Sequence, residues 1–361
     1  MSIVAPAARG LVAVDVDDAT KVEAVIGELF LRKSRAAHAY GPHPAQLWNL
    51  AAQTVSGGKM VRPRLLLAAY RALSGSADVP QVVVDAAAAV ELLHYAFVLH
   101  DDVIDGDTVR RGRPNLIGAM AARAPSHPRA LHRGNTAAIL MGDLVLSAAY
   151  QHLARLDVTA QRRVRLLDAV DHTIDQTVAG EWVDVALADG FADPALDVIL
   201  EMSANKTACY TFELPLRLAA ILADCTPQTE RALATAGRHL GLAFQLDDDL
   251  LCAFGAPAEH GKDPLSDLRE GKQTPIVAYA RTTREWELIA GDVGRHDLST
   301  KDAERVRDVL TSCGAKGFVE RLRDASVGQV HRACGERRAG IPREAAQVLL
   351  AFANGLEGRR S

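Results

Sequence analysis

The 361-residue sequence is poor in aromatic residues, has no dominant charge and contains no long uninterrupted apolar run. Phe, Trp and Tyr make up 5% of the chain, and strand-like alternation of Val, Ile and Thr is hard to find. The net charge of −4 argues against a general nucleic-acid-binding protein, which would carry a basic surface. The most apolar stretch, residues 82–102, is interrupted by Asp85, Glu91 and His94, so we expect no transmembrane segment.

Cysteine is scarce as well, and none of the five cysteines belongs to a CxxC pair. An odd number of unclustered cysteines indicates buried thiols in a reducing compartment and argues against a disulfide framework or a zinc site. The N-terminus lacks a basic start followed by an apolar block, so we expect no secretory signal. These absences together predict a cytoplasmic protein.

What the sequence does contain is helical periodicity. Apolar residues recur at three- and four-residue intervals in segments such as "PRLLLAAYRAL" and "TAAILMGDLVLSAAYQHLARL". Breaks that carry Gly or Pro, such as "GPHP", "SGSADVP" and "RGRPN", separate these segments. We therefore predict an all-α fold, a single large bundle of helices over residues 19–355, preceded by a disordered segment, residues 1–18.

The first cluster of charged residues is "LHDDVIDGDTVRRGRP", directly after an apolar helical run. Asp101, Asp102 and Asp105 can converge at one helix end, where they repel each other unless a cation neutralises them. Oxygen ligands without a nearby His/Cys set favour Mg2+ over Zn2+. Arg110 and Arg111 are suited to clamp a diphosphate, because guanidinium groups bind phosphate oxygens in a bidentate manner. The alternative is an acidic helix cap followed by a solvated basic loop.

A second acidic cluster, "FQLDDDLL", follows another apolar helix far downstream. Asp247, Asp248 and Asp249 are expected to end that helix, with Gln245 one turn before Asp248. The Gly- and Pro-bearing loop after it carries Lys262 and Lys272, which could close over a phosphate. Two such helices facing each other would place carboxylates on both sides of one cavity.

A third basic segment, "SGGKMVRPRL", combines a Gly-Gly turn with Lys59 and Arg62 shortly before a helix start. Backbone amides and paired cations suit a second anion, although for this segment alone a basic loop that opens a helix is the better explanation. It is not a nucleotide P-loop, because no GxxxxGK[ST] pattern is present.

In their order along the chain, the segments "GGKMVRP", "LHDDVIDGDTVRRGRP", "NKTA", "FQLDDDLL" and "GKDPLSDLREGKQT" resemble the trans-isoprenyl diphosphate synthases, the polyprenyl synthetase family. They spread over residues 57–274, most of the chain. The resemblance implies an all-α bundle around a deep central cavity, usually a homodimer. It also implies Mg2+-dependent, head-to-tail condensation of isopentenyl diphosphate with allylic diphosphates, with three Mg2+ ions per site.

The resemblance assigns roles to individual residues. It places the metal ligands at Asp101, Asp102, Asp105 and Asp248. The pocket for isopentenyl diphosphate is expected from Lys59, Arg62, His94 and Arg111. Contacts to the allylic diphosphate are expected from Arg110, Lys206, Thr207, Gln245, Lys262 and Lys272. The residues expected to act in catalysis are Asp101, Asp102, Asp105, Arg110, Lys206, Thr207, Gln245, Asp248 and Asp249. His94 lies two turns before Asp101 on the same helix face, which fits its assignment.

One position departs from the family pattern. The second motif usually reads DDxxD, but Cys252 replaces its third acid, and an extra acid, Asp247, precedes the pair. A thiol is a poor Mg2+ ligand, so we expect activity with weaker binding of one metal ion. Asp247 could replace the missing acid only if the helix rotated or frayed, because on a regular helix it points about 100° away from Asp248.

Product length is expected to depend on the residues before Asp101, because one helical turn rises about 5.4 Å, close to the length of an isoprene unit. In the family, bulky residues four or five positions before the motif shorten the product. Phe97, Ala96 and Leu93 are the candidate chain-length residues. Phe97 with Ala96 favours geranylgeranyl diphosphate, with farnesyl diphosphate as the alternative; a packing role for Phe97 is equally compatible. A longer-chain synthase is a further alternative.

Two other functions are considered. A class I terpene cyclase would carry an (N/D)DxxSxxxE motif, which is absent downstream of residue 240, and would not need Lys59, Arg62 and Arg111. A non-catalytic regulatory subunit is favoured by Cys252 alone, and the intact first motif argues against it.

Overall fold

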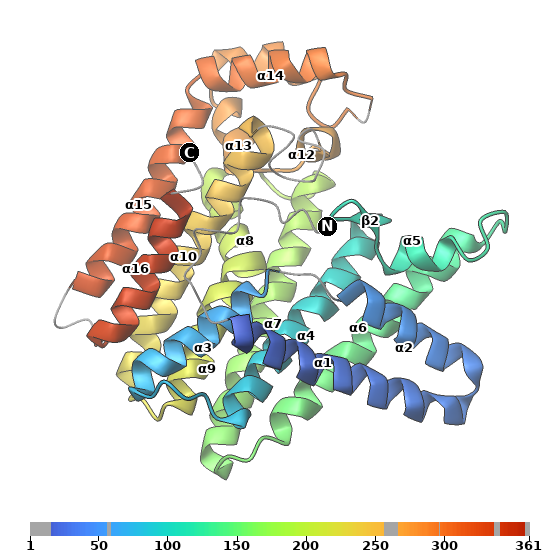
Figure 1. Cartoon of the computed structure of the whole chain (residues 1–361). Coiled ribbons are helices and arrows are strands. Elements are labelled where there is room, and N and C mark those ends of the chain that lie inside the picture. Colours follow the sequence, from blue (N-terminus) through green and yellow to red (C-terminus); the bar gives the residue numbers. More distant parts are fainter. Residues whose placement is uncertain (1–15, 56–58, 256–265, 296, 336–339, 358–361) are drawn as a thin grey trace. The chain divides into compact units, whose positions relative to one another are not determined.

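The computed structural model describes residues 16–55, 59–255, 266–295, 297–335 and 340–357 (Figure 1). Among these residues, regular structure is almost entirely helical. The exception is a short antiparallel ribbon in which β1 (Val109–Arg110) pairs with β2 (Arg113–Pro114). The all-α prediction is therefore confirmed.

The chain divides into two compact units. The N-terminal unit comprises Val14–Asp168 with Ile221–Ala223, and the C-terminal unit includes Ala169–Ala220 and Asp224–Ser361. A single domain over residues 19–355 and a central cavity stay predictions. Helix α1 begins at Val16, so the last three residues of the segment predicted to be disordered are helical. Asp18 is buried there and accepts a hydrogen bond of 2.8 Å from Arg71, while residues 1–15 lie outside the described part of the chain.

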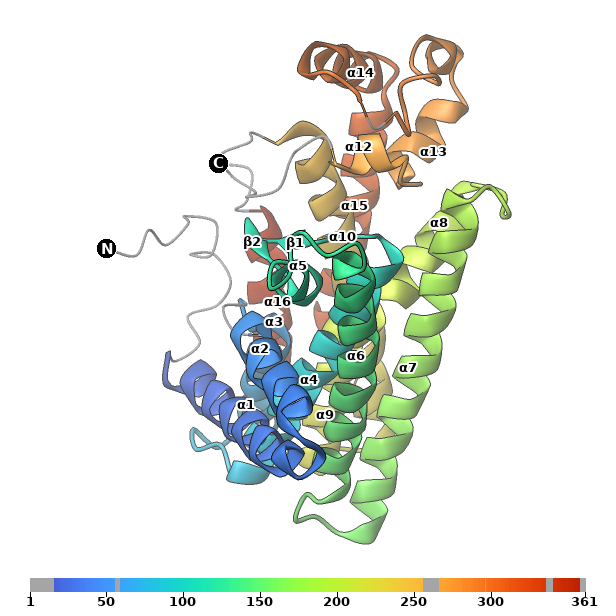
Figure 2. The same ribbon diagram turned by 90° about the vertical axis from the view of Figure 1, so that its right-hand side faces the viewer.

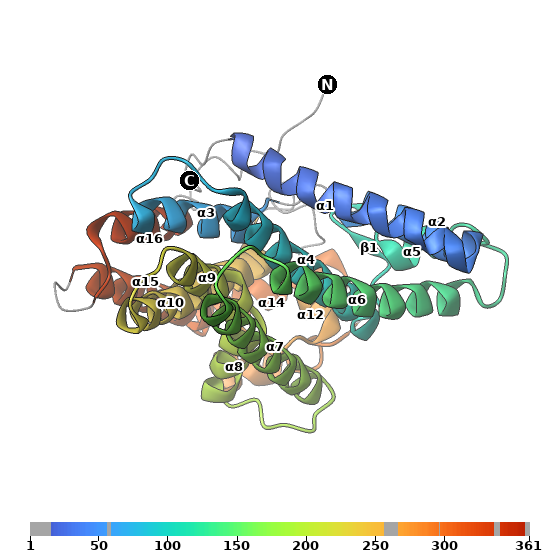
Figure 3. The same cartoon turned by 90° about the horizontal axis from the view of Figure 1, so that it is seen from below.

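The N-terminal unit is built around helix α4 (Gln81–Ile104), which packs against α1, α3, α5 and α6 (Figure 3). The other elements of this unit are α1 (Val16–Ala37), η2 (His38–Tyr40), α2 (Pro42–Val55), α3 (Val61–Ser74), α5 (Leu116–Ala121), α6 (Ala130–Ala154) and the start of α7 (Ala160–Ala188). Residues 86–89 of α4 are four consecutive alanines, all fully buried. Small side chains on every face let neighbouring helices approach α4 from several directions.

Helices α4 and α6 are long and apolar enough to span a membrane by length and composition. The relevant window of α4 is 72% buried within the protein, as expected for a core helix, and that of α6 is 44% buried. The absence of a transmembrane segment therefore stays an expectation.

The C-terminal unit centres on helix α10 (Pro227–Phe254), which packs against η3, α15 and α16. Its other elements are α8 (Leu196–Ser203), the π-helix η3 (Ala204–Glu213), α9 (Leu214–Leu222), α12 (Ser266–Glu270), α13 (Pro275–Arg281), η4 (Arg284–Leu288), α14 (Thr300–Ser312), α15 (Ala315–Gly335) and α16 (Arg343–Glu357). Thr226 caps α10, and Pro227 occupies its first turn, where a missing N–H costs nothing. Leu246 and Leu250 of α10 join a buried cluster with Ile276, Val306 and Val319.

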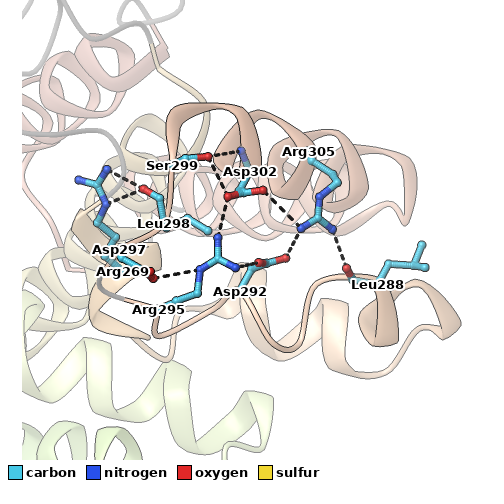
Figure 4. Close-up of polar contacts among 9 residues, drawn as sticks. All are labelled: Arg269, Leu288, Asp292, Arg295, Asp297, Leu298, Ser299, Asp302 and Arg305. Atoms are coloured by element: carbon cyan, nitrogen blue, oxygen red, sulfur yellow. Dashed lines mark hydrogen bonds and ion pairs between the residues drawn. The ribbon is translucent and has the colours of Figure 1, made fainter.

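Helices α12, α13 and α14 gather at one end of this unit (Figure 2). A charged network fixes the start of α14 to the segment before it (Figure 4). Arg295 bridges Asp292 at 2.9 Å and Asp302 at 2.6 Å, and Arg305 contacts the same two carboxylates. Ser299 caps α14 by accepting a hydrogen bond from the backbone N–H of Asp302. Four charged groups thus hold α14 against the η4 segment.

None of the five cysteines forms a disulfide. Cys209 is buried and the other four are half-buried. Burial of all five was therefore an overestimate. Cys209 contacts the hydroxyl of Thr177 at 3.2 Å, and burial raises the pKa of this thiol to about 11.

Candidate active site

The first acidic cluster lies at the C-terminal end of α4. The helix ends at Ile104, and Asp105 caps it by donating its N–H to the carbonyl of Asp101 at 2.8 Å. Asp101 is half-buried and Asp105 is exposed, whereas Asp102 is only 1% exposed. The three carboxylates therefore lie at one helix end but differ in their exposure to solvent.

Arg110 pairs with the buried Asp102. Its Nε donates to Asp102 Oδ1 at 2.8 Å, and a terminal nitrogen lies 2.7 Å from Asp102 and 3.1 Å from Asp101. Burial raises the pKa of Asp102 above its ordinary value, and the adjacent guanidinium opposes that rise. Asp102 holds Arg110 in this structure, and Asp101 and Asp105 are the more accessible carboxylates. The metal-binding role of Asp102 stays a prediction.

The β1–β2 ribbon positions the arginines. Arg111 and Gly112 both have left-handed backbone conformations, with φ of 55° and 70°, and form the tight turn between the strands. Gly118 of α5 packs so closely on this ribbon that a Cβ atom there would lie 2.2 Å from the carbonyl oxygen of Thr108. The ribbon was not predicted, because two-residue strands leave no periodic signal.

A second cluster in the same unit combines Arg62 of α3, His94 of α4 and Arg111 of the ribbon turn. Burial lowers the pKa of His94 well below its ordinary value, and the nearby Arg62 and Arg111 lower it further. The imidazole of His94 is therefore neutral, and its charged neighbours include the guanidinium groups of Arg62 and Arg111. Lys59, also predicted for this pocket, is exposed two residues before the start of α3, and the two glycines before it are not among the described residues.

Sequence reasoning missed Glu91, which belongs to the same cluster. Its side chain is 8% exposed, and Oε2 is buried without a hydrogen-bond partner among the described residues. Burial raises the pKa of Glu91, and Arg62 and Arg111 lower it in part. The spacing of three between Glu91 and His94 on a helix could have indicated that they share a face.

The second acidic cluster lies within α10, which continues to Phe254, so the expectation that the three acids end the helix was wrong. The acids point in three directions. Asp247 is buried and pairs with Arg323 of α15 at 3.1 Å. Asp249 is buried and accepts a hydrogen bond of 2.9 Å from Gln245. Asp248 is exposed and has no ion-pair partner among the described residues.

Lys206 and Thr207 lie on the π-helix η3, and both are half-buried. The Lys206 ammonium contacts Asp184 at 2.6 Å and Glu181 at 2.9 Å, both on α7. Gly180 makes this close approach possible, because a Cβ atom there would lie 2.3 Å from the backbone nitrogen of Lys206. π-helical turns often occur at functional sites. Glu181 and Asp184 were missed, although their spacing of three places them on one helix face.

Of the two loop lysines, Lys272 is half-buried and follows Gly271, whose φ is 70°, while Lys262 lies outside the described residues. Thr274 and Pro275 then start α13. Lys272 therefore lies in the short connection between α12 and α13.

In both units, the predicted metal ligands are carboxylate oxygens. Asp101, Asp105 and Asp248 keep their side chains half-buried or exposed. Hard oxygen donors of this kind fit Mg2+. In the described part of the chain, no group of three or more His, Cys, Asp or Glu residues forms a preassembled metal site.

Residues 44–310 match the family model described as polyprenyl synthetase. The chain belongs to the polyprenyl synthetase family. A (2E,6E)-farnesyl diphosphate synthase of Mycobacterium tuberculosis is 36% identical over 71% of this chain and 67% of its own length. A geranylgeranyl diphosphate synthase of the same organism is 33% identical over 78% of this chain and 76% of its own.

Among solved structures, this polyprenyl synthetase is similar to the geranylgeranyl pyrophosphate synthase of Corynebacterium glutamicum, crystallised with isoprenyl diphosphate and magnesium. The TM-score is 0.83 at 29% identity, covering 96% of this chain and 100% of the other. The isoprenoid synthase fold and the predicted family are confirmed, and the chain is an enzyme of the prenyltransferase class.

The chain-length candidates of this polyprenyl synthetase differ in exposure. Phe97, one turn before Asp101, is half-buried, whereas Ala96 and Leu93 are 0% and 2% exposed. Phe97 is thus the most accessible of the three.

Proposed function

We propose that this prenyl chain-elongation enzyme condenses isopentenyl diphosphate with allylic diphosphates in a Mg2+-dependent, head-to-tail reaction and makes geranylgeranyl diphosphate. The observation that carries this proposal is the pairing of two different anion sites in the N-terminal unit. The acids at the end of α4 suit a diphosphate bound through metal. The cluster of Arg62, His94 and Arg111 suits a diphosphate bound directly by cations.

Each residue then has a role in binding or in stabilising charge. Arg110, held by Asp101 and Asp102, presents a guanidinium to the allylic diphosphate as it departs. Lys206, held by Glu181 and Asp184, adds a second positive charge. Thr207 and Gln245 contribute neutral dipoles near the allylic cation. Because His94 is neutral, it can donate a hydrogen bond without adding a proton source near that cation.

Asp101, Asp102, Asp105 and Asp248 are the residues that would hold Mg2+, three ions per site in our proposal. Bound Mg2+ neutralises the charge that develops on the leaving diphosphate. Asp249, buried and bonded to Gln245, orients that amide and is a weaker candidate for metal contact.

The product length is supported by residue size rather than by the family alone. Relatives include geranylgeranyl, farnesyl and octaprenyl diphosphate synthases, so family membership leaves length open. Phe97 lies one turn before Asp101, and its neighbour Ala96 has a small side chain. A single bulky residue at this level favours geranylgeranyl diphosphate over much longer products.

The test is chromatography of the products formed from isopentenyl diphosphate with dimethylallyl, geranyl or farnesyl diphosphate, with and without Mg2+. We expect geranylgeranyl diphosphate from all three starters and no product after chelation of Mg2+. A main product of another length would overturn the assignment of length. Hydrocarbon formed from farnesyl diphosphate alone would indicate a cyclase, and no elongation of any starter would indicate a regulatory subunit.

A further inference from the structure

Asp247 is the acid that the family pattern leaves unexplained. It is 2% exposed, and its Oδ1 accepts a hydrogen bond of 3.1 Å from Arg323 of α15, which is 5% exposed. Arg323 also contacts Asp324 at 3.1 Å, and that carboxylate is largely exposed. A buried pair of opposite charges, 76 residues apart in the chain, therefore joins α10 to α15 at the residue next to Asp248.

Two further contacts hold the end of α10, and both come from helices that follow it in the sequence. Arg307 of α14 donates its Nε to the carbonyl of Ala253 at 2.7 Å. Lys316 of α15 lies 5.1 Å from the ring centre of Phe254. Asp248 and Asp249 thus lie on a stretch of helix that is anchored at Asp247 and again at residues 253–254.

The helix that carries Arg307 is itself fixed. The charged network of Asp292, Arg295, Asp302 and Arg305 joins the first turns of α14 to the segment before it (Figure 4). Arg305 also donates to the carbonyl of Leu288 at 2.8 Å. Arg307, which contacts the end of α10, therefore belongs to a helix that is itself held in place.

We propose that Asp247 and Arg323 are a positioning pair: they fix the rotation of α10 so that Asp248 presents its carboxylate to Mg2+. This inference rests on the proposed function, because it assigns the pair to the metal-binding helix. Asp247 is a positioning residue and not a metal ligand, since its carboxylate faces α15 while that of Asp248 is exposed. On a regular helix the two side chains diverge by about 100°.

The test uses Arg323→Met, Asp247→Leu and the double variant, with Arg321→Met, an exposed arginine on the same helix, as control. The measurements are the Mg2+ concentration for half-maximal rate, the KM for each substrate, and the thermal unfolding temperature without metal. Rates are taken well below the unfolding temperature of each variant. We expect either single variant to raise the half-maximal Mg2+ concentration about tenfold, as loss of a ligand-orienting partner does, and to leave the KM for isopentenyl diphosphate unchanged.

The double variant separates positioning from direct ligation. Replacement of a buried ion pair by apolar residues of similar size restores packing, so it should recover most of both the Mg2+ response and the unfolding temperature. If Asp247 were a ligand, the double variant would keep the weakened Mg2+ response. If the pair were only structural, the single variants would unfold earlier but respond to Mg2+ like the control. Absence of product from the unaltered enzyme would instead refute the proposed function, and the unfolding temperatures would still test the ion pair.

Discussion

Glu91 is the side chain at which burial and charge oppose each other most clearly. It is nearly inaccessible, yet it lies close enough to Arg62 and Arg111 for both to affect its ionisation. The cations favour the carboxylate and burial favours the acid, and burial is the larger effect. A negative charge at this position would also compete with a diphosphate for the two arginines.

Glu91→Gln should therefore change the pH dependence of stability. Because the folded-state pKa is raised, Glu91 contributes stability that is present below its unfolded pKa and is lost as pH rises through the folded pKa. The difference in unfolding free energy, native enzyme minus variant, should decrease as the pH is raised from about 4 to about 8. Urea unfolding at both pH values measures it. A difference that rises with pH would show that the carboxylate is stabilised by the arginines.

Phe97→Ala should lengthen the product by at least one isoprene unit. The side chain is half-buried one turn before Asp101, so its removal opens the level at which the growing chain would stop. Chromatography of the products shows the change, and Tyr95→Phe serves as control. Tyr95 donates to the carbonyl of Ala51 at 3.1 Å and packs in the core, so its hydroxyl should not affect length. An unchanged product from Phe97→Ala would place the length determinant elsewhere.

At the scale of elements, the close approach of α7 to η3 depends on a single glycine. Gly180→Ala would place a methyl group against the Lys206 backbone, which cannot yield as a side-chain tip could. We expect a loss of about 1–3 kcal/mol in unfolding free energy, together with slower catalysis, because Lys206 must move. Urea unfolding and kcat measure the two effects.

Gly27→Ala on α1 is the matched control for that substitution. Nothing lies within 4 Å of its Cβ position, so alanine should be neutral or stabilise the helix by up to about 1 kcal/mol. Equal effects of the two substitutions would mean that helix propensity, and not the contact with Lys206, decides the outcome.

The elements also show where sequence reasoning succeeded and where it failed. Apolar periodicity predicted helices such as α4 and α10, because their faces are buried at regular intervals. It placed the end of α10 too early, since three consecutive acids resemble a terminus. The role of Asp247 could not be predicted from the sequence, because its partner Arg323 is 76 residues away and no local pattern joins them. The close contact of Gly180 on α7 with the Lys206 backbone likewise joins residues that no local pattern connects.

At the scale of the whole molecule, a homodimer stays a proposal from the family resemblance. Ile139, Leu140 and Leu144 on α6 are 43–51% exposed, which is unusual for large apolar side chains on one helix. Sedimentation velocity should give about twice the chain mass of 38.7 kDa, and Leu140→Glu should shift it to the monomer. A native chain that sediments as a monomer would contradict the proposal.

The central claim is that carboxylates of the two acidic motifs bind the allylic diphosphate through Mg2+, and it can be measured without turnover. Calorimetry with Mg2+ and geranyl diphosphate, in the absence of isopentenyl diphosphate, gives the affinity of the allylic site. The variants are Asp101→Asn from the N-terminal unit, Asp248→Asn from the C-terminal unit, and the two combined. We predict that each single variant weakens the same binding event about tenfold or more, and that their free-energy losses are not additive. If Asp248→Asn binds geranyl diphosphate as tightly as the native enzyme, Asp248 takes no part in binding the allylic diphosphate and the account is wrong.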